Sequence, residues 1–337
     1  MVLSYGRGRM PVGWHRPMLS VAVVMALLAV VSAVGLVVDD RVLLGAPVWL
    51  KPLKFALSNA IYAATWAWLF SLLQQHRVLA NRTTNVLVAV MYVEYVLILV
   101  QAIRARPSHF NFSTPTDAII YTAMGISIGV LWTGALILTI LVLRAPIADV
   151  ATRWALQSGV VISLVGISLG ALMVTPTQPQ LESMGNGTFQ GMIGAHSVGV
   201  ADGGPAMPLT GWSMTGGDLR IPHFLGMHAL QVLPIVFVLL TLLARRVPRL
   251  RPSAMRARLV AVAAAGYAAM LALVTWQAER GQPLFQPDLL VLCGFTVLVI
   301  AVAGGVAVSL SRPVLEREPS GSHTSGNPGG VPHQHRS

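Results

Sequence analysis

The sequence predicts an all-α integral membrane protein, a polytopic bundle of about eight transmembrane helices with both termini in the cytoplasm. Of its 337 residues, 55% are hydrophobic and only 10% are charged, whereas a soluble domain has roughly 25% charged residues. Eight apolar segments each approach the length that crosses a bilayer. Lys and Arg gather on one side of these segments, and this bias sets orientation in a membrane.

Each segment holds about 20 largely apolar residues, because the hydrocarbon core is roughly 30 Å thick and a helix rises about 1.5 Å per residue. The second segment begins beside Lys51 and Lys54, and the third carries Glu94 at its middle. These two are therefore the least apolar. The predicted segments are 18–38, 52–73, 84–103, 116–143, 154–174, 222–243, 258–276 and 288–310. Arginines precede the first segment as in a signal peptide, but it runs on without a cleavage site, so we expect a retained anchor.

The orientation follows from the basic residues. Sixteen of the 23 Lys and Arg residues lie on the side of the N-terminus and seven lie on the other side. Basic residues near span ends stay in the cytoplasm, which places residues 1–17 and the tail 311–337 inside and residues 18–310 in a membrane domain. The tail is rich in Pro, Gly, Ser and His and is expected to be disordered. The expected location is the cell membrane, with multiple crossings and the lipid bilayer as partner.

The formal charge of +11 does not indicate nucleic-acid binding, because the bases lie in short clusters between apolar segments. Cys293 is the single cysteine, so neither a disulfide framework nor a Cys-x-x-Cys pair is available within one chain. We find no matching motif between the first four and the last four segments, and so predict no internal repeat.

The loop at 175–221 is the one long connection. It contains ten glycines mixed with apolar residues such as Phe189, Ile193 and Trp212. A flexible linker would be rich in Gly and Ser with few apolar side chains. The composition favours a structured extracytoplasmic cap, and a disordered loop is the alternative.

Four histidines map to the outer face: His109, His196, His223 and His228. Imidazole is a common metal ligand, so these four are the candidate metal ligands, with haem, copper, iron or zinc as candidate cofactors. On a regular helix His223 and His228 point roughly 140° apart, which weakens chelation by that pair. The alternatives are helix capping for His223 and an interhelical hydrogen bond for His228.

Glu94 is the only acid well inside a span, where a charge costs at least a few kcal/mol. Gln101 and Arg104 continue its face toward the outside. Glu94 is predicted to be a proton relay, a ligand or a protonated hydrogen-bond donor, and we group it with His109 and His196 as candidate catalytic residues.

Lys51 and Lys54 are the only lysines and lie on the side that the positive-inside bias disfavours. With His228 they are candidate cofactor-binding residues, at a mouth that attracts a carboxylate, phosphate or haem propionate. Snorkelling to lipid phosphates is the alternative. Ser58, Tyr62 and Thr65 continue the Lys54 face as a polar stripe that must meet other helices or a wet cavity.

Two further patterns concern architecture. Small residues recur down the fifth segment at Gly159, Ser163, Gly166 and Gly170, which allows close helix packing. Two exposed ion pairs of little energetic weight are expected, Asp218 with Arg220 and Glu279 with Arg280.

Three functions remain open. The first is a metal- or haem-dependent membrane oxidoreductase with an outward-facing His site. The number of spans, the orientation and the outer-face histidines together resemble haem A synthase in architecture. That family places histidine pairs on helices in both halves of its bundle, whereas no second pair occurs here, so no residue role is carried over. The second is a proton-coupled transporter or channel for a small solute, and the third is a receptor-like or assembly subunit. The substrate and the oligomeric state stay undetermined.

Overall fold

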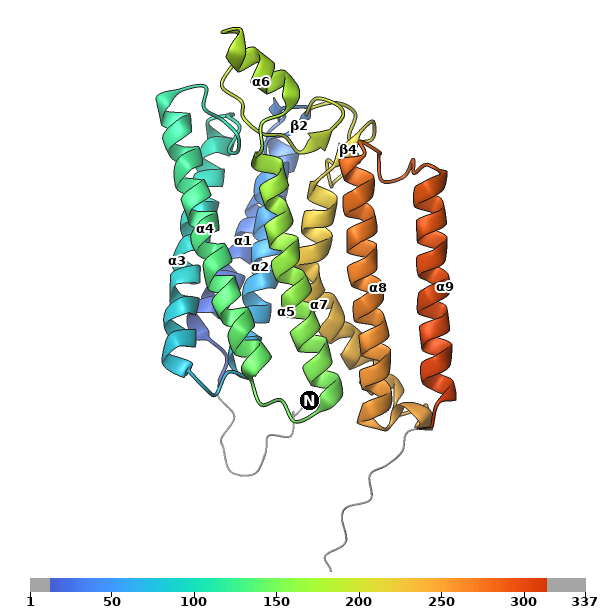
Figure 1. Cartoon of the computed structure of the whole chain (residues 1–337). Helices are drawn as coiled ribbons and strands as arrows, with labels where there is room; N and C mark the ends of the chain where they lie inside the picture. The colour runs from blue at the N-terminus through green and yellow to red at the C-terminus, as the bar shows by residue number, and fades with distance from the viewer. Residues whose placement is uncertain (1–12, 314–337) are drawn as a thin grey trace, which may run out of the picture.

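The computed structural model describes residues 13–313, and this part of the chain is mostly helical. Eight long helices run side by side (Figure 1). They are α1 (Arg16–Val38), α2 (Leu50–Phe70), α3 (Arg77–Ile103), α4 (Pro115–Arg144), α5 (Val150–Leu169), α7 (Arg220–Leu243), α8 (Ser253–Glu279) and α9 (Leu289–Ser311). Their connections are short except for the long loop between α5 and α7. Residues 314–337 of the predicted tail and residues 1–12 of the predicted cytoplasmic N-terminus lie outside the described residues.

The all-α prediction is confirmed, and seven of the long helices are long and apolar enough to cross a membrane. The prediction of about eight spans is thus supported only in part, because α2 is not among the seven. Lys54, Asn59 and Tyr62 lower the hydropathy of α2. This helix nevertheless lies against α1 and α3 inside the bundle, so much of its surface meets protein.

The start of α1 and the end of α9 lie at the same end of the bundle (Figure 1). We call the opposite end the cap end, because the long loop between α5 and α7 folds over it. The loop contains the 3₁₀ turn η1 (Gly170–Val174), helix α6 (Gln178–Gly185) and strands β3 (Ser197–Val198) and β4 (Gly217–Asp218). Strands β1 (Val42–Leu43) and β2 (Ala46–Pro47) form a hairpin beside it, and η2 (Pro248–Leu250) lies at the other end of the bundle.

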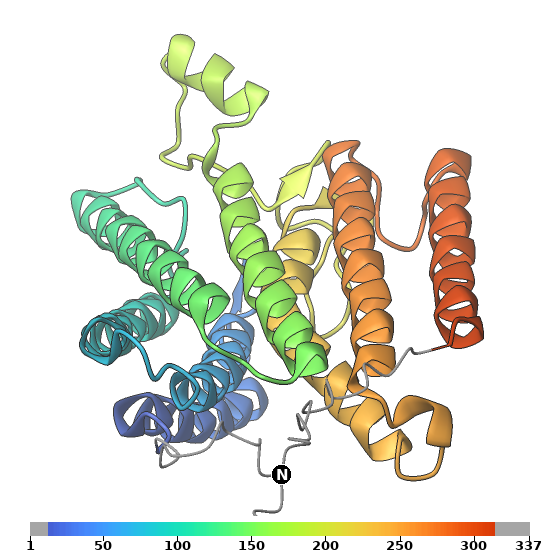
Figure 2. The same ribbon diagram turned by 60° about the horizontal axis from the view of Figure 1, so that its bottom comes forward.

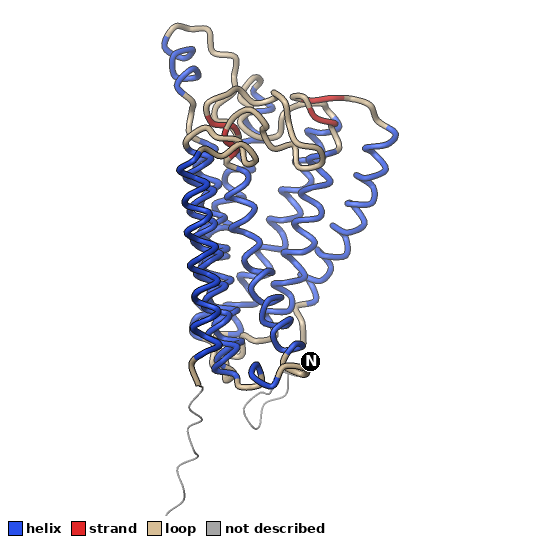
Figure 3. Tube along the Cα trace, turned by 90° about the vertical axis from the view of Figure 1, so that its right-hand side faces the viewer, coloured by secondary structure: helices blue, strands red, loops and turns tan. Residues whose placement is uncertain are grey.

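The cap is held close to the helices by backbone contacts, and α6 projects beyond it (Figure 3). Phe112 N–H donates to Gly191 O at 2.6 Å, and Ala195 N–H donates to Met173 O at 3.0 Å. Gly191 has φ of 85°, and a Cβ there would lie 2.5 Å from Ser113 Cα. Only glycine can occupy this position, where the two backbones lie so close together. The glycines of the loop therefore allow tight folding and do not indicate a flexible linker.

The small-residue stripe on α5 packs against α7, as predicted. A Cβ on Gly166 would lie 2.3 Å from the carbonyl carbon of Gly226, so the two backbones meet directly. Ser163 Oγ donates a hydrogen bond to Met227 O at 2.9 Å across the same interface. The helices of the bundle form two groups, α1–α4 and α5–α9 (Figure 2). The α5–α7 contact lies within the second group, and α4 meets α5 between the groups.

Candidate functional site

The first turn of α2 directs two lysines into the cap. Lys51 Nζ lies 3.1 Å from His109 Nδ1, and Lys54 Nζ donates to Thr210 O at 2.8 Å. Both ammonium groups are partly buried and contact loop residues. This geometry differs from snorkelling, in which the charged ends would extend away from the bundle toward lipid.

His109 lies in the turn between α3 and α4, among the rings of Phe55, Phe110 and Tyr121. Burial and the neighbouring charge of Lys51 hold the pKa of His109 well below its usual 6.5. The imidazole is therefore neutral at pH 7, and its Nδ1 lone pair accepts the hydrogen bond from Lys51. Two N–H groups of the Lys51 ammonium are left to bind something else.

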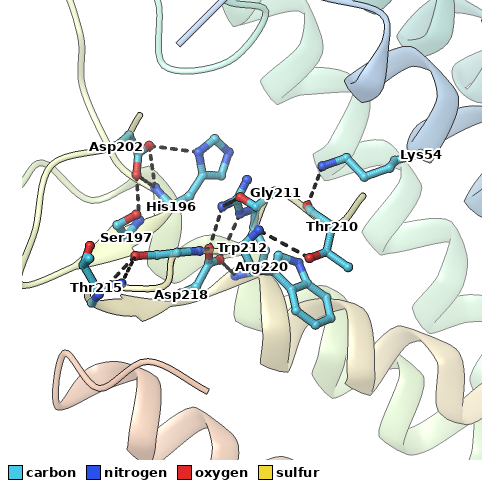
Figure 4. A network of polar contacts seen from close by, with 12 residues as sticks. Lys54, His196, Ser197, Asp202, Thr210, Gly211, Trp212, Thr215, Asp218 and Arg220 are labelled. Atoms are coloured by element: carbon cyan, nitrogen blue, oxygen red, sulfur yellow. Dashed lines mark hydrogen bonds and ion pairs between the residues drawn. The ribbon is translucent and has the colours of Figure 1, made fainter. Parts of the chain in front are cut away.

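His196 precedes β3 and pairs with Asp202. Its Nδ1 lies 2.9 Å from Asp202 Oδ2, and the backbone N–H groups of His196 and Ser197 donate to the same carboxylate (Figure 4). Burial lowers the pKa of His196, although the hydrogen bond to Asp202 opposes the shift. Burial raises the pKa of Asp202, but hydrogen bonds from His196 outweigh it and hold that pKa below its usual range. Within residues 13–313 no hydrogen-bond partner contacts Nε2 of His196, so this nitrogen is left available.

Arg220, at the start of α7, clamps the tip of a cap hairpin. Its Nη2 donates to Gly211 O at 2.6 Å, next to the Thr210 carbonyl that Lys54 holds (Figure 4). Arg220 also pairs with Asp218 through Nε at 2.9 Å and Nη2 at 2.5 Å. Asp218 is only 1% exposed, so the prediction of an exposed pair is wrong. The sequence pattern gave the pairing but not the hairpin that buries it.

The two histidines of α7 bond to neighbouring groups in the bundle. His223 Nδ1 lies 2.8 Å from Gly166 O on α5. His228 Nδ1 lies 3.3 Å from Gln231 Oε1, and Gln231 Nε2 donates to Thr65 Oγ1 on α2 at 3.1 Å. The predicted polar stripe of α2 thus meets α7 at Thr65. Both imidazoles have a structural hydrogen bond that links or supports helices.

The four histidines do not assemble into one metal site. In the part of the chain that the structure describes, no group of three or more His, Cys, Asp or Glu side chains is placed to hold a metal ion. Phe110 lies between the two cap histidines, with its ring centroid 5.0 Å from that of His196 and 6.1 Å from that of His109. The catalytic and single-ligand roles of these histidines stay predictions.

Glu94 is buried in α3 with 4% of its surface exposed. Neither carboxyl oxygen has a hydrogen-bond partner among the described residues. Gln101 and Arg104, which were expected to continue its face, donate hydrogen bonds to Asp117 instead.

Gln101 and Arg104 both bind Asp117, a residue that sequence reasoning had not assigned to any site. Gln101 Nε2 and Arg104 Nη1 donate to Asp117 Oδ1 at 3.0 and 2.9 Å. Thr114 Oγ1 donates to the other carboxylate oxygen at 2.8 Å and caps α4. The Thr-x-x-Asp pattern at the start of α4 was the available signal, since it resembles a capping box.

No protein family, curated protein or solved structure matches this chain.

Proposed function

We propose that this protein is a proton-coupled membrane transporter of a small anionic solute, which binds at the cap end against Lys51 and Lys54. The observation that carries the proposal is the absence of a carboxylate partner for either lysine within residues 13–313. Each lysine makes one hydrogen bond to a neutral acceptor and retains two free donors.

Five of the acids near the cap end are engaged with other basic groups. Asp39, Asp117, Asp202, Asp218 and Asp288 pair with Arg41, Arg104, His196, Arg220 and Arg280 in that order. Taking an ammonium out of water without a counterion costs several kcal/mol. A carboxylate or phosphate from outside the chain would offset that cost, and the N-terminus of α2 adds positive potential at the same place.

Glu94 supports proton coupling. A buried carboxyl without a partner is stable only when it is neutral, so this residue gains and loses a proton according to what binds beside it. It lies nine residues before the end of α3 at Ile103, which places it about 14 Å below the cap end. An anion at Lys51 and a proton at Glu94 would be bound close enough to influence each other.

We further propose that the cap faces the outside of the cell membrane, with both termini in the cytoplasm and α2 as an eighth crossing. The arginine bias supports this orientation. An eighth crossing also returns the chain to the side on which it began, which agrees with the shared end of α1 and α9.

Reconstituted vesicles test the proposal. Purified protein is placed in liposomes that contain a pH-sensitive dye, and succinate or inorganic phosphate is added outside. We expect the wild type to carry protons inward with one of these anions, and Glu94→Gln to abolish that flux. Asn81→Ala, at the opposite end of α3, is the control for insertion and folding. If the Glu94→Gln variant carried protons as fast as the wild type, Glu94 would not be the proton carrier. If neither succinate nor phosphate were bound or produced a flux, the protein would not be an anion transporter of this kind.

A metal-dependent oxidoreductase is the second candidate, and one observation favours it. Asp202 orients His196 through Nδ1 and leaves Nε2 available, which is how a second-shell carboxylate prepares a histidine ligand. Elemental analysis and a visible spectrum of the purified protein test this candidate. Stoichiometric copper, iron or zinc that His196→Ala removes would support it, and metal-free protein with every histidine intact would eliminate it.

A further inference from the structure

Two turns at the cap end have the same sequence pattern and the same hydrogen bonds. The segment 101–107 reads QAIRARP after α3, and the segment 277–283 reads QAERGQP after α8. In the first, Gln101 Nε2 donates to Pro107 O at 3.2 Å, and in the second, Gln277 Nε2 donates to Pro283 O at 2.7 Å. The residue after the arginine has a left-handed backbone in both turns, with φ of 51° and 71°.

The match continues into the next helix. Arg104 pairs with Asp117 at 2.9 Å, and Arg280 pairs with Asp288 at 2.6 Å, each aspartate lying at the start of the following helix. This corrects the expected pairing of Arg280 with Glu279. The preceding helices α3 and α8 are both 27 residues long. The two halves thus share a turn motif that the sequence comparison did not reveal, because the matching residues are few and their common hydrogen bonds appear only in the structure.

The other helices follow the same order in both groups. On α1, Ser32 and Gly35 are buried at the spacing of the buried Ser163 and Gly166 on α5. On α2 and α7, four buried positions coincide when Pro52 is aligned with Pro222. The buried pairs are Pro52 with Pro222, Ala56 with Gly226, Ala63 with Leu233 and Ala67 with Phe237. The groups α1–α4 and α5–α9 thus contain equivalent four-helix sets in one order, with α6 and the cap loop added to the second (Figure 2).

We infer that the chain is a tandem duplication of one four-helix unit, and that the charges present in only the first unit mark its ligand-binding side. With Gln101 placed on Gln277, Glu94 falls on Met270. With Pro52 placed on Pro222, Lys51 falls on Ile221 and Lys54 on Phe224. The second unit builds the same helices with apolar side chains at all three positions. The four-helix unit therefore does not need these charges in order to fold.

Polar residues that occur in both units have hydrogen-bond partners, whereas the buried carboxyl that occurs in only one unit has none among the described residues. Gln101 and Gln277 are buried with their amide groups hydrogen-bonded, as structural polar groups are. Glu94 is equally buried, yet both of its oxygens lack a partner among the described residues. A polar group that the fold does not need and does not satisfy is expected to serve a ligand or a proton.

The two units then have different roles, and this step rests on the proposed function. The first unit supplies Lys51 and Lys54 from α2 and Glu94 from α3. The second unit supplies Arg220, which holds the cap hairpin over Lys54. One anionic group binds per chain, on the α2 and α3 side, rather than two at symmetric places.

The test replaces each unrepeated charge by its counterpart from the second unit. The variant carries Lys51→Ile, Lys54→Phe and Glu94→Met together, and Gln101→Leu and Gln277→Leu are matched variants at repeated positions. Thermal unfolding in detergent is measured with and without succinate or inorganic phosphate. We expect the triple variant to unfold within a few degrees of the wild type or above it, and to lose the shift that an anion gives to the wild type. Each glutamine variant is expected to unfold several degrees lower and to keep that shift.

The outcomes separate the two ideas. A triple variant that unfolds well below both glutamine variants would overturn the duplication argument, even if the wild type responds to an anion. A triple variant that folds and keeps the full anion shift would overturn the assignment of the ligand side. A wild type without any anion shift would overturn the ligand assignment together with the proposed function, while the order of the unfolding temperatures would still decide the duplication.

Discussion

Removing the charge of Asp218 should loosen the cap more than removing the charge of an exposed aspartate in the same kind of ion pair. Asp218 accepts from Arg220 Nε and Nη2 and from the backbone N–H groups of Ser213 and Arg220. In Asp218→Asn the amide NH₂ faces donors on at least one side, so two of these bonds are lost or weakened. The charged partner Arg220 stays in place with only 20% of its side chain exposed.

The magnitude follows from that burial. Breaking a buried ion pair by removing one partner costs about 3–5 kcal/mol. Since Arg220 retains some contact with solvent and its bond to Gly211 O, we expect about 3 kcal/mol for Asp218→Asn. Asp288→Asn is the control, because Asp288 also pairs with an arginine but both side chains are about one third exposed. Asparagine still caps α9, so a much smaller loss is expected there.

Equilibrium unfolding in mixed micelles, followed by tryptophan fluorescence, measures both variants. Limited proteolysis within the cap gives a second readout, since a released hairpin should be cut faster. Equal losses in the two variants, or a loss below about 1 kcal/mol for Asp218→Asn, would show that the Arg220 clamp does not hold the cap.

Two further predictions concern helix packing and pH. Gly166→Ala should destabilise the bundle by about 1–3 kcal/mol, because its Cβ meets the backbone of Gly226. Gly129→Ala, where nothing lies within 4 Å, should be neutral or stabilising by about 0.5–1 kcal/mol, and similar losses in both would refute the close α5–α7 contact. The unfolding free energy should fall as pH drops from 7 to 5, because His109 and His196 have lowered pKa values when folded and the unfolded chain takes up protons near pH 6.5. The pKa of Asp202 is lowered, so its contribution to the unfolding free energy is lost only at pH values below the usual range of an aspartate. If a double His109→Gln, His196→Gln variant kept the wild-type slope of unfolding free energy against pH, these two histidines would not be its cause.

The helices could be predicted from the sequence because hydropathy depends on local composition. The predicted segments of α1, α7 and α9 begin and end within two residues of the helices in the structure. The start of α3 was placed too late, since Arg77 and Arg82 are polar but helical. Hydropathy marks where a helix enters lipid, whereas the helix itself continues beyond that point.

The candidate site could be predicted only as a set of residue types. Lys51, Lys54 and Glu94 stood out because each is costly in its place. Their partners lie far away in sequence, as with Lys54 and Thr210, and a carbonyl acceptor has no sequence signature. The hydrogen-bond partners of the histidines could not be predicted for the same reason. The number of histidines indicated metal binding, but His223 bonds to a backbone carbonyl on α5 that no residue pattern reveals.

Under the inferred duplication, the presence of a residue in one unit or in both indicates what that residue serves. A residue that appears in both units, such as the buried glutamine of each turn, is explained by the packing of that unit. A residue that appears in only one unit is not explained by the packing of that unit and is expected to serve a ligand or a proton. Glu94 and the two lysines are residues of this kind. The cap loop is likewise present once, and its hairpin meets Lys54 on one side and Arg220 on the other. An anion that displaced Thr210 O from Lys54 would remove one of the two bonds that hold the hairpin tip, so ligand binding and cap opening are expected to be coupled through this single contact.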